Sequence, residues 1–365
     1  MKRILVSAQE ASGDRLGAEL ILAMRARADG EQLEVSGLVG PLLLKAGAVP
    51  LPDSLPMNPV MGLVEVLKHL GELRHNTVAM ARAIDARPDV LVVIDAPDFN
   101  LPLARAAKAK GVPVVGLVSP QLWAWRSGRA QDIARSLDLL LCLFPFEPAY
   151  YTPHGLDARW IGHPAIDRVR PSAREPGVVA LFPGSRRSEI KRLLNPFLAA
   201  VAGLGAREVL LPLAASLSAA DLGPLPANVR LCTSEEALSR ADRALTKSGT
   251  STLEIALAGI PMVVAHRVHP LTYWIGRLLV RGVQHLSLPN ILLGREAVRE
   301  HVQYFTPEQL TADLRAAAPP PTEELAALLG APGVADRAAA AVLALVGIPP
   351  GDAPRSPLSG SPSSG

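Results

Sequence analysis

The chain has 365 residues, of which 49% are hydrophobic and 19% are charged. It therefore contains enough apolar material for a folded core and too little charge for a disordered polyelectrolyte. At about 100 to 200 residues per domain, the length predicts two domains or one large one. The 37 basic and 34 acidic residues leave a formal charge of +3, a small excess that argues against nucleic acid as a partner.

The two cysteines, Cys142 and Cys232, lie in apolar or strand-like segments without the spacing of a metal site. We expect both to be buried thiols in a reducing cytoplasm. No apolar run reaches the roughly 18 residues of a spanning helix. The first apolar run stops at Gln9 and Glu10, which argues against a secretory signal.

The first half of the chain alternates short apolar runs with longer stretches of helical periodicity. The runs predict strands at Ile4–Ser7, Leu33–Gly37, Val90–Ile94, Val112–Leu117 and Leu139–Leu143. The periodic stretches predict helices at Leu16–Ala28, Glu65–Ala86, Leu101–Lys110 and Arg129–Ser136. Apolar strands separated by helices indicate a parallel sheet that is covered on both faces.

The alternation restarts after Arg170–Gly177, a stretch with two prolines and a glycine that predicts a linker. Strands are expected at Val178–Phe182, Val209–Leu213, Val229–Leu231, Ala244–Thr246 and Met262–Ala265, with helices from about Ser188 and Thr250. We therefore predict an α/β protein with two Rossmann-like domains, residues 1–168 and 177–346, whose last helices can pack back on the first domain. The Pro/Gly/Ser-rich tail, residues 349–365, is expected to be disordered.

In open α/β sheets, ligands bind past the carboxyl ends of the strands, where loops meet helix N-termini. The first such segment is Ala8–Gly17, a loop rich in small residues after the opening strand. Ser12 or Asp14 is expected to cap the following helix. A capped turn without a ligand is the alternative interpretation.

The second segment, Leu181–Ile190, again follows a strand. Gly184 lets a ligand come close to the backbone, Ser185 offers a hydroxyl, and Arg186 supplies a guanidinium with two parallel N–H donors at a helix start. This combination suits a diphosphate. The alternative is a surface arginine that pairs with Glu189.

The third segment, Lys247–Glu254, lies between a strand and a helix. Its small hydroxyl residues can bind phosphate oxygens at the helix N-terminus, and Glu254 lies one turn further on, within reach of a ribose diol. Two such loops facing one cleft predict a nucleoside diphosphate.

The sequence lacks a Walker A lysine motif, a GxSxG elbow and a DxD motif. The diphosphate charge would then be met by Arg186 and helix dipoles instead of a metal ion. Asp95 and Asp98 follow a strongly apolar strand, so their side chains are expected at the cleft edge of the first domain. There one of them can take a proton from an acceptor hydroxyl. For Asp95, helix capping is the competing role.

Nine distinctive segments follow one another in a fixed order: Ser12–Gly17, Val60–Val66, Asp95–Asn100, Ser119–Arg126, Pro145–Glu147, Gly162–Pro164, Pro183–Arg186, Ser248–Thr250 with Leu253–Glu254, and Ser287–Asn290 with Gly294–Glu296. Together they closely resemble the lipid-A-disaccharide synthase family, and the resemblance runs from about Ile4 to about Gln303. Gln9 stands where that family usually has a glycine, whereas Glu10 keeps its place.

The resemblance implies a GT-B enzyme, with two Rossmann-like domains facing an interdomain cleft. It would join UDP-2,3-diacylglucosamine to 2,3-diacylglucosamine 1-phosphate (lipid X) by inversion, without a metal or cofactor, and release UDP. Asp98 is the favoured general base, with Glu10 and Asp95 as second candidates. The expected substrate-binding residues are Ser12, Gly13, Gly184, Ser185, Arg186, Ser248, Gly249, Thr250, Glu254 and Asn290.

Because these substrates carry acyl chains, the enzyme would meet the cytoplasmic face of the inner membrane as a peripheral protein. Met57–Leu73 combines apolar residues with a basic flank, as in helices that lie in the headgroup layer. A core-facing amphipathic helix is the ordinary alternative. The family resemblance also allows a homodimer.

Two rival functions stay open at this point. One is another GT-B enzyme that uses UDP-N-acetylglucosamine, either a muramyl-pathway transferase or a 2-epimerase. The other is a catalytically silent module that binds sugar nucleotides at the membrane. The joint presence of Asp98, Arg186 and Glu254 argues against the silent module.

Overall fold

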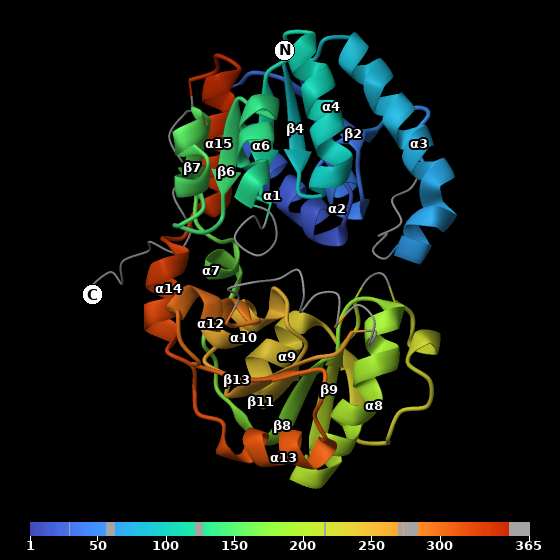
Figure 1. Cartoon of the computed structure of the whole chain (residues 1–365), viewed down its shortest axis with the longest axis vertical. Helices are drawn as coiled ribbons and strands as arrows, with labels where there is room; N and C mark the ends of the chain where they lie inside the picture. Colours follow the sequence, from blue (N-terminus) through green and yellow to red (C-terminus); the bar gives the residue numbers. More distant parts are fainter. Residues whose placement is uncertain are drawn as a thin grey trace, which may run out of the picture. The chain divides into compact units, whose positions relative to one another are not determined.

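The computed structural model describes residues 1–28, 30–55, 63–120, 127–214, 217–268, 273 and 284–349. These residues form two compact units (Figure 1). The first unit contains Met1–Pro164 together with the segment from Gly333 onward, and the second contains Ala165–Pro332.

The first unit is built on a parallel sheet of seven strands in the order β3-β2-β1-β4-β5-β6-β7. Its central strand β4 has the sequence Val-Leu-Val-Val-Ile and is buried at every position, as expected for a strand covered on both faces. The strands are β1 (Lys2–Ala8), β2 (Leu33–Leu38), β3 (Val49–Pro50), β4 (Val90–Ile94), β5 (Val114–Leu117), β6 (Leu139–Cys142) and β7 (Asp157–Trp160).

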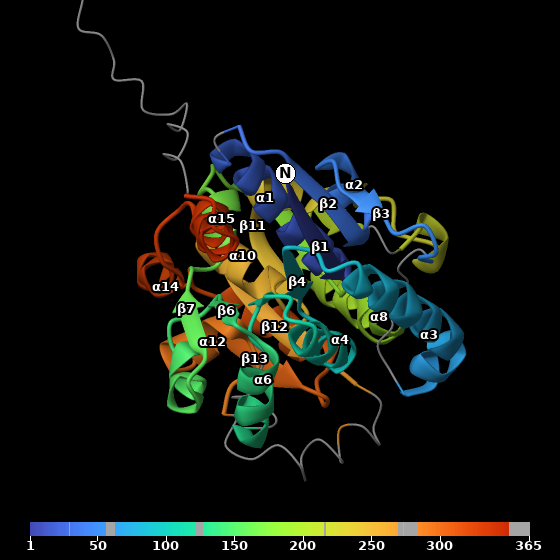
Figure 2. The same cartoon turned by 90° about the horizontal axis from the view of Figure 1, so that it is seen from above.

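Helices cover the faces of this sheet. They are α1 (Ala11–Arg27), α2 (Pro41–Lys45), α3 (Leu63–Asp85), α4 (Pro97–Ala109), α6 (Ala130–Ser136) and α15 (Val334–Leu345), with short 3₁₀ turns at Ser127–Arg129, Pro148–Tyr150 and Thr152–His154. The last helix, α15, packs beside α1 (Figure 2). The first unit is thus completed by a segment from the far end of the sequence.

The second unit contains a parallel sheet of six strands in the order β10-β9-β8-β11-β12-β13. Its strands are β8 (Glu175–Phe182), β9 (Glu208–Pro212), β10 (Val229–Cys232), β11 (Ala241–Thr246), β12 (Met262–His266) and β13 (Arg299–Val302). Its helices are α7 (Ala165–Arg168), α8 (Arg187–Leu204), α9 (Ser234–Arg240), α10 (Ser251–Leu257), α12 (Leu288–Leu293), α13 (Pro307–Ala316) and α14 (Thr322–Leu329), with a 3₁₀ turn at Ala219–Asp221. Among the described residues of this unit, buried apolar side chains cluster into a core.

Both sheets have the doubly wound strand order. The chain adds strands first on one side of its opening strand and then returns to add the others on the opposite side, so the strand order reverses beside the opening strand. The reversal lies between β1 and β4 in the first unit, and between β8 and β11 in the second. At such a point the two neighbouring loops leave the carboxyl edge in opposite directions and open a crevice for ligands. Ala8–Gly17, Asp95–Asn100, Leu181–Ile190 and Lys247–Glu254 all occur at these two points.

The described residues include one stretch, Thr322–Leu345, with the length and apolar composition of a membrane-spanning helix. In the structure it consists of two helices, α14 and α15, separated by residues 330–333. Gly330 and Gly333 have positive φ values of 92° and 89°, which interrupts the helix between them.

The apolar runs predicted the central strands of both sheets, whereas other expectations need correction. The expected linker, Arg170–Gly177, ends earlier, because β8 begins at Glu175 and pairs there with Ala241. Cys142 is buried as expected, but Cys232 is half-buried, because it ends β10 at the edge of the sheet.

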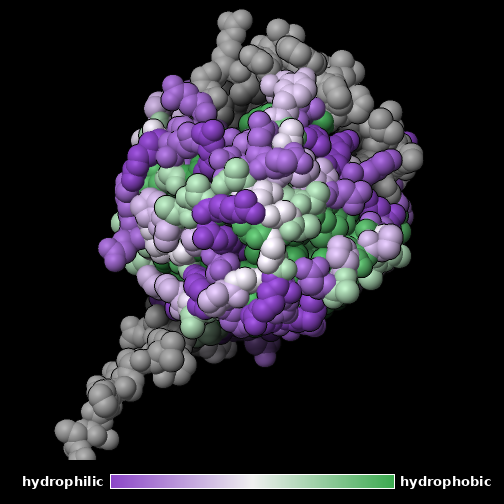
Figure 3. All heavy atoms as spheres, turned by 90° about the horizontal axis from the view of Figure 1, so that it is seen from below, coloured by the Kyte–Doolittle hydropathy of each residue, from purple (hydrophilic) through white to green (hydrophobic). Residues whose placement is uncertain are grey.

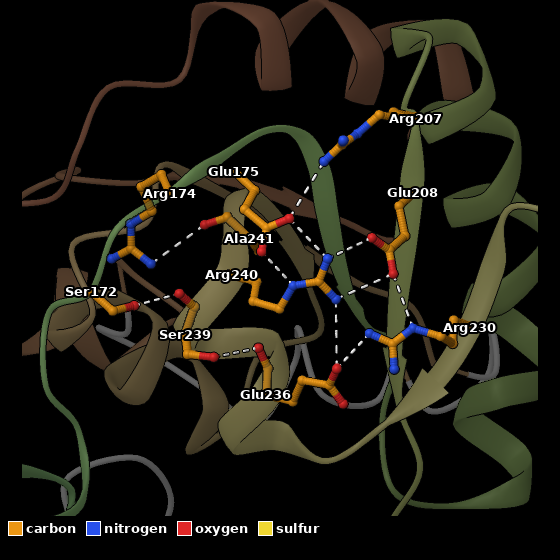
Figure 4. A network of polar contacts seen from close by, with 10 residues as sticks. All are labelled: Ser172, Arg174, Glu175, Arg207, Glu208, Arg230, Glu236, Ser239, Arg240 and Ala241. Atoms are coloured by element: carbon orange, nitrogen blue, oxygen red, sulfur yellow. Dashed lines mark hydrogen bonds and ion pairs between the residues drawn. The ribbon is translucent and has the colours of Figure 1, made fainter.

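Ion pairs join the amino ends of β8 and β9 to α9 (Figure 4). The Arg240 guanidinium contacts Glu175 at 2.5 Å, Glu208 at 2.8 Å and Glu236 at 3.5 Å. Arg230 contacts the last two of these carboxylates. Hydrogen bonds from Arg240 hold the pKa values of Glu175 and Glu208 below their ordinary range. A network in which one arginine serves three carboxylates fixes its members better than isolated surface pairs do.

The molecular surface seen from below mixes hydrophobic and hydrophilic residues. Figure 3 shows several hydrophobic areas, each bordered by hydrophilic residues. Such mixing is ordinary on the surface of a folded protein.

Candidate functional site

The carboxyl edge of the first sheet is held together by the buried side chain of Asn100. Its Oδ1 atom accepts a hydrogen bond from the Ser7 hydroxyl at 2.6 Å. Its Nδ2 atom donates to the carbonyl oxygens of Ile94, at 3.2 Å, and Asp95, at 2.7 Å. Asn100 therefore connects the end of β1 to the turn that follows β4.

That turn has a strained backbone. Asp95 and Ala96 have φ values of 51° and 45°, and Val118, at the end of the neighbouring strand β5, has a φ of 77°. Positive φ is costly for residues other than glycine, above all for a β-branched one, and such strain concentrates at functional sites. Burial raises the pKa of the Asp95 carboxyl, against a smaller opposing effect of the Ala96 N–H.

Asp98 lies in the first turn of α4, because this helix starts at Pro97 and not at Leu101 as predicted. A proline at the first helical position costs no hydrogen bond, so the helix can begin directly after the turn. The Asp98 side chain is 83% exposed and accepts two hydrogen bonds of 3.1 Å from the Arg129 guanidinium. Arg129 carries no motif signal in the sequence, so its contact with Asp98 was not foreseen.

The first loop is shorter than predicted, because α1 begins at Ala11. Ser12 and Gly13 are therefore helical, and Glu10 occupies the N-cap position. The expectation that Ser12 or Asp14 caps this helix is wrong. The buried Asp14 carboxylate instead accepts hydrogen bonds of 2.8 to 3.0 Å from the N–H groups of Gly40, Leu42 and Leu43, and so caps α2.

In the second unit, the loop after β8 folds around the carboxylate of Glu189. Its Oε2 atom accepts a 3.0 Å hydrogen bond from the Ser185 N–H, and its Oε1 atom contacts Arg186 Nη1 at 3.3 Å. Lys247, at the end of β11, reaches the same Oε1 atom at 2.9 Å. The predicted pairing of Arg186 with Glu189 exists, and it is part of a larger cluster that includes a lysine from the neighbouring strand.

Gly184 leaves the space that this carboxylate occupies. Its φ is 127°, and a Cβ atom there would lie 2.3 Å from Glu189 Oε2. A larger residue at this position would displace the Glu189 side chain as well as strain the backbone. The glycine therefore has a structural reason in addition to the expected approach of a ligand.

The loop after β11 leads into α10, with Thr250 at the N-cap position. The Ser248 hydroxyl donates to the Leu286 carbonyl oxygen at 2.8 Å, and a Cβ atom on Gly249 would meet nothing within 4 Å. Glu254, in the first turn of α10, is half-buried. This loop adjoins the Gly184–Arg186 loop, because Thr246 pairs with Phe182 across the reversal point.

Asn290, the remaining predicted binding residue, is completely buried. Its Nδ2 atom donates to the Val298 carbonyl oxygen and to Glu300 Oε1, and its Oδ1 atom accepts from the N–H groups of Ala297 and Val298. These four hydrogen bonds use the full capacity of the amide. In the structure Asn290 holds the segment before β13 in place.

A buried polar cluster in the first unit was not predicted. Glu147 Oε2 accepts 3.0 Å hydrogen bonds from the N–H groups of Leu143 and Phe144. Ser119 hydrogen-bonds both Glu147 and the Tyr151 hydroxyl. Burial raises the pKa of Glu147 to about 7, although these hydrogen bonds oppose the rise.

A second titratable group with a shifted pKa, the half-buried His266, ends β12 in the second unit. Burial, with a smaller effect of the nearby Lys247, lowers its pKa to about 4. Its Nδ1 atom has no hydrogen-bond partner among the described residues. The histidine is therefore neutral at physiological pH and adds no third cation beside Lys247 and Arg186.

No group of three or more His, Cys, Asp or Glu side chains that could hold a metal ion occurs within the described ranges. At the carboxyl edge of the second sheet, two cations, Arg186 and Lys247, lie beside the Ser185 N–H and share the Glu189 carboxylate. This is the chemistry of an anion site.

Two doubly wound units in one chain, with polar loops at both reversal points, define the class of proteins with the GT-B fold. Solved structures agree. The calicheamicin glycosyltransferase CalG4 matches with a TM-score of 0.60 at 18% identity, covering 95% of this chain and 98% of that one. MurG of Acinetobacter baumannii matches with a TM-score of 0.53 at 17% identity, covering 95% of this chain and 99% of that one.

At the level of sequence, the profile of the lipid-A-disaccharide synthetase family matches residues 4–318. The lipid-A-disaccharide synthase of Geobacter sulfurreducens is 41% identical over an alignment of 325 residues that covers 82% of this chain and 83% of the relative. The chain belongs to the lipid-A-disaccharide synthase family and is a glycosyltransferase of lipid A biosynthesis. The fold alone, which MurG shares, would not have separated it from other GT-B enzymes.

Proposed function

We propose that the chain transfers 2,3-diacylglucosamine from UDP-2,3-diacylglucosamine to lipid X, giving the β-1,6-linked lipid A disaccharide 1-phosphate and UDP. The observation that carries this proposal is the pair of cations, Arg186 and Lys247, that converge beside the Ser185 N–H at the reversal point of the second sheet. The diphosphate is the part of UDP-2,3-diacylglucosamine that two cations and a backbone N–H recognise.

In this proposal the acceptor hydroxyl oxygen attacks the anomeric carbon from the face opposite UDP. The bond from that carbon to the diphosphate oxygen breaks, its electron pair stays on UDP, and the hydroxyl proton passes to a carboxylate. Direct displacement inverts the anomeric carbon and needs no covalent intermediate. Asp98 is the proposed base, because it is exposed at the carboxyl edge of the first sheet, and Glu10 and Asp95 are second candidates.

Further residues have supporting roles in the proposal. Ser248, Gly249 and Thr250 border the diphosphate, and Glu254 reaches the ribose diol. Asn290 acts by holding the segment before β13 in place. Gly184 and Ser185 complete the loop after β8, and Ser12 and Gly13 contact the substrate from the first turn of α1.

We also propose that the protein works as a peripheral protein on the cytoplasmic face of the inner membrane. The supporting segment, Met57–Leu73, falls partly outside the described residues, which exclude residues 56–62 and the side chains of residues 63–70. Further along α3, Arg74, His75 and Val78 are exposed, so a basic flank beside an apolar residue continues along this helix. Co-sedimentation with vesicles that contain anionic lipids tests this association, and analytical ultracentrifugation tests whether a homodimer forms.

The experiment that tests the reaction is incubation of the purified protein with UDP-2,3-diacylglucosamine and lipid X, followed by mass spectrometry of the lipid. The expected product is the disaccharide 1-phosphate, with UDP released in equal amount. Unacylated UDP-N-acetylglucosamine serves as the control donor. Its turnover in place of the acylated donor would favour the muramyl-pathway or 2-epimerase alternatives.

A further inference from the structure

The carboxylate of Glu189 contacts the hydrogen-bond donors and cations that the proposed nucleotide site offers to a phosphate. One of its oxygens takes the Ser185 N–H, and the other contacts Lys247 and Arg186. A phosphate oxygen at this loop would use the same backbone N–H and the same two cations. Glu189 thus stands where an anion would bind.

The carboxylate is held there firmly and as an ion. The Glu189 side chain is 13% exposed, compared with 20% for Lys247 and 28% for Arg186. Burial alone would raise the pKa of Glu189, but Lys247, Arg186 and the Ser185 N–H together bring it below the ordinary value. The half-buried His266 is neutral, so it adds no positive charge beside Lys247 and Arg186.

We propose that Glu189 is an internal counter-anion, which competes with the diphosphate for the Ser185 N–H, Arg186 and Lys247, and so limits how tightly UDP is held. The inference rests on the proposed function and assigns Lys247 a part in diphosphate binding. Without nucleotide, the Glu189 carboxylate places a negative charge beside the partly buried Arg186 and Lys247. When the diphosphate arrives, the carboxylate gives up some of these contacts, and it takes them back as UDP leaves.

The alternative is that Glu189 merely positions Arg186 and Lys247 for the ligand. The two roles predict opposite results for Glu189→Gln, which keeps the size of the side chain and an oxygen that can accept the Ser185 N–H. Removing a competing anion tightens nucleotide binding, whereas releasing two positioned cations weakens it.

The test is calorimetric titration of the purified full chain with UDP at low salt. For Glu189→Gln we expect the UDP Kd to fall about tenfold, as for the loss of one partly screened charge repulsion. Dissociation of UDP, followed by stopped flow, should slow by a similar factor. An unchanged or higher Kd would overturn the inference.

The matched control is Glu324→Gln, which removes the same charge from the same unit. Glu324 pairs with Arg295 instead of the loop after β8, so this variant should leave the Kd unchanged. Equal tightening in both variants would show a general charge effect and would also overturn the inference.

A second variant, Lys247→Gln, guards against a Glu189→Gln protein that does not fold. It should raise the UDP Kd at least tenfold, and adding Glu189→Gln to it should then tighten binding less than in the parent chain. A parent chain that does not bind UDP would contradict the proposed function itself. A parent chain that binds UDP, with Lys247→Gln leaving the Kd unchanged, would contradict only this inference.

Discussion

The hydroxyl of Ser7, on β1, donates a 2.6 Å hydrogen bond to the amide oxygen of Asn100, on α4, and both side chains are buried. The same amide donates to the carbonyl oxygens of Ile94 and Asp95. Asn100 thereby fixes the turn with positive φ that separates β4 from Asp98. This turn decides where the carboxylates at the edge of the first sheet lie.

Replacing Asn100 should therefore affect both stability and turnover. In Asn100→Ala the Ser7 hydroxyl and two carbonyl oxygens lose their buried partner, which we expect to lower the free energy of unfolding by about 1 to 3 kcal/mol. Turnover should fall further than this loss of stability explains, because the turn before Asp98 loosens. Denaturant titration and steady-state kinetics measure the two effects.

A matched control for this variant is Asn76→Ala. Asn76 is also buried, and its amide holds the N–H and carbonyl groups of Leu55. This control should lose comparable stability while keeping its turnover. Equal losses of turnover in the two variants would show that Asn100 acts through general stability alone.

Glu147 should make the stability of the protein depend on pH. Its pKa is about 7 in the fold because of burial, against 4.5 for an ordinary glutamate, so between these pH values the native state keeps a proton that the unfolded chain has lost. Its contribution to the free energy of unfolding is thus present below about pH 4.5 and is lost as the pH rises through 7, on the order of 3 kcal/mol in total.

Glu147→Gln removes this titration, so the free energy of unfolding should decline less between pH 5 and pH 8, on the order of 2 kcal/mol less, than in the parent chain. Denaturant titrations of both proteins across this range measure the difference. Parallel pH profiles would mean that the buried carboxyl is ionised in the fold.

Arg186→Ala should weaken UDP binding, because a charge-assisted contact with the diphosphate contributes about 1.5 to 3 kcal/mol. Calorimetric titration with UDP gives the change in affinity. The neighbouring Arg187 is the control, since it is 78% exposed and pairs with Asp221. Near-normal UDP affinity in Arg186→Ala, or an equal loss in Arg187→Ala, would remove Arg186 from the nucleotide site.

Chelation should leave turnover unchanged, because Arg186, Lys247 and helix N-termini are proposed to neutralise the diphosphate. The measurement is the initial rate in EDTA, with and without added Mg²⁺. A rate that disappears in EDTA and returns with Mg²⁺ would show that the charge of the leaving group is neutralised by a metal ion.

The sequence predicts the central strands because their apolar runs, such as Val90–Ile94, are buried on both faces and leave a clear pattern. It does not predict β7 or β13, which are short and partly exposed at the sheet edges. Edge strands pack on few neighbours, so polar residues such as Asp157 and Arg299 are tolerated there and remove the apolar signal.

In the candidate site, too, only features with a local sequence pattern can be predicted. The small and charged residues of the loops after β4, β8 and β11 are visible in the sequence, because a loop after an apolar strand has a known place in the fold. The contacts of Lys247 with Glu189 and of Arg129 with Asp98 join separate segments. Such contacts leave no local pattern and become visible in the folded structure.

The choice of base is tested by comparing Asp98→Asn with Asp95→Asn. Asparagine keeps the size and the hydrogen-bonding reach of aspartate but cannot accept the proton as a carboxylate does. If Asp98 is the base, turnover of Asp98→Asn should fall by roughly 10²- to 10⁴-fold while UDP binding remains. The exposed position of Asp98 at the start of α4 should make this change nearly neutral for stability.

Asp95→Asn should cost less in turnover and more in stability, because Asp95 is partly buried and lies in the turn with positive φ. Turnover of both variants is measured at saturating donor, with UDP affinity and denaturant midpoints measured on the same preparations. The reverse pattern would move the base to Asp95. Equal mild losses in both variants would instead assign the proton to Glu10, at the end of the neighbouring strand β1, since its loop lies beside theirs at the reversal point of the sheet.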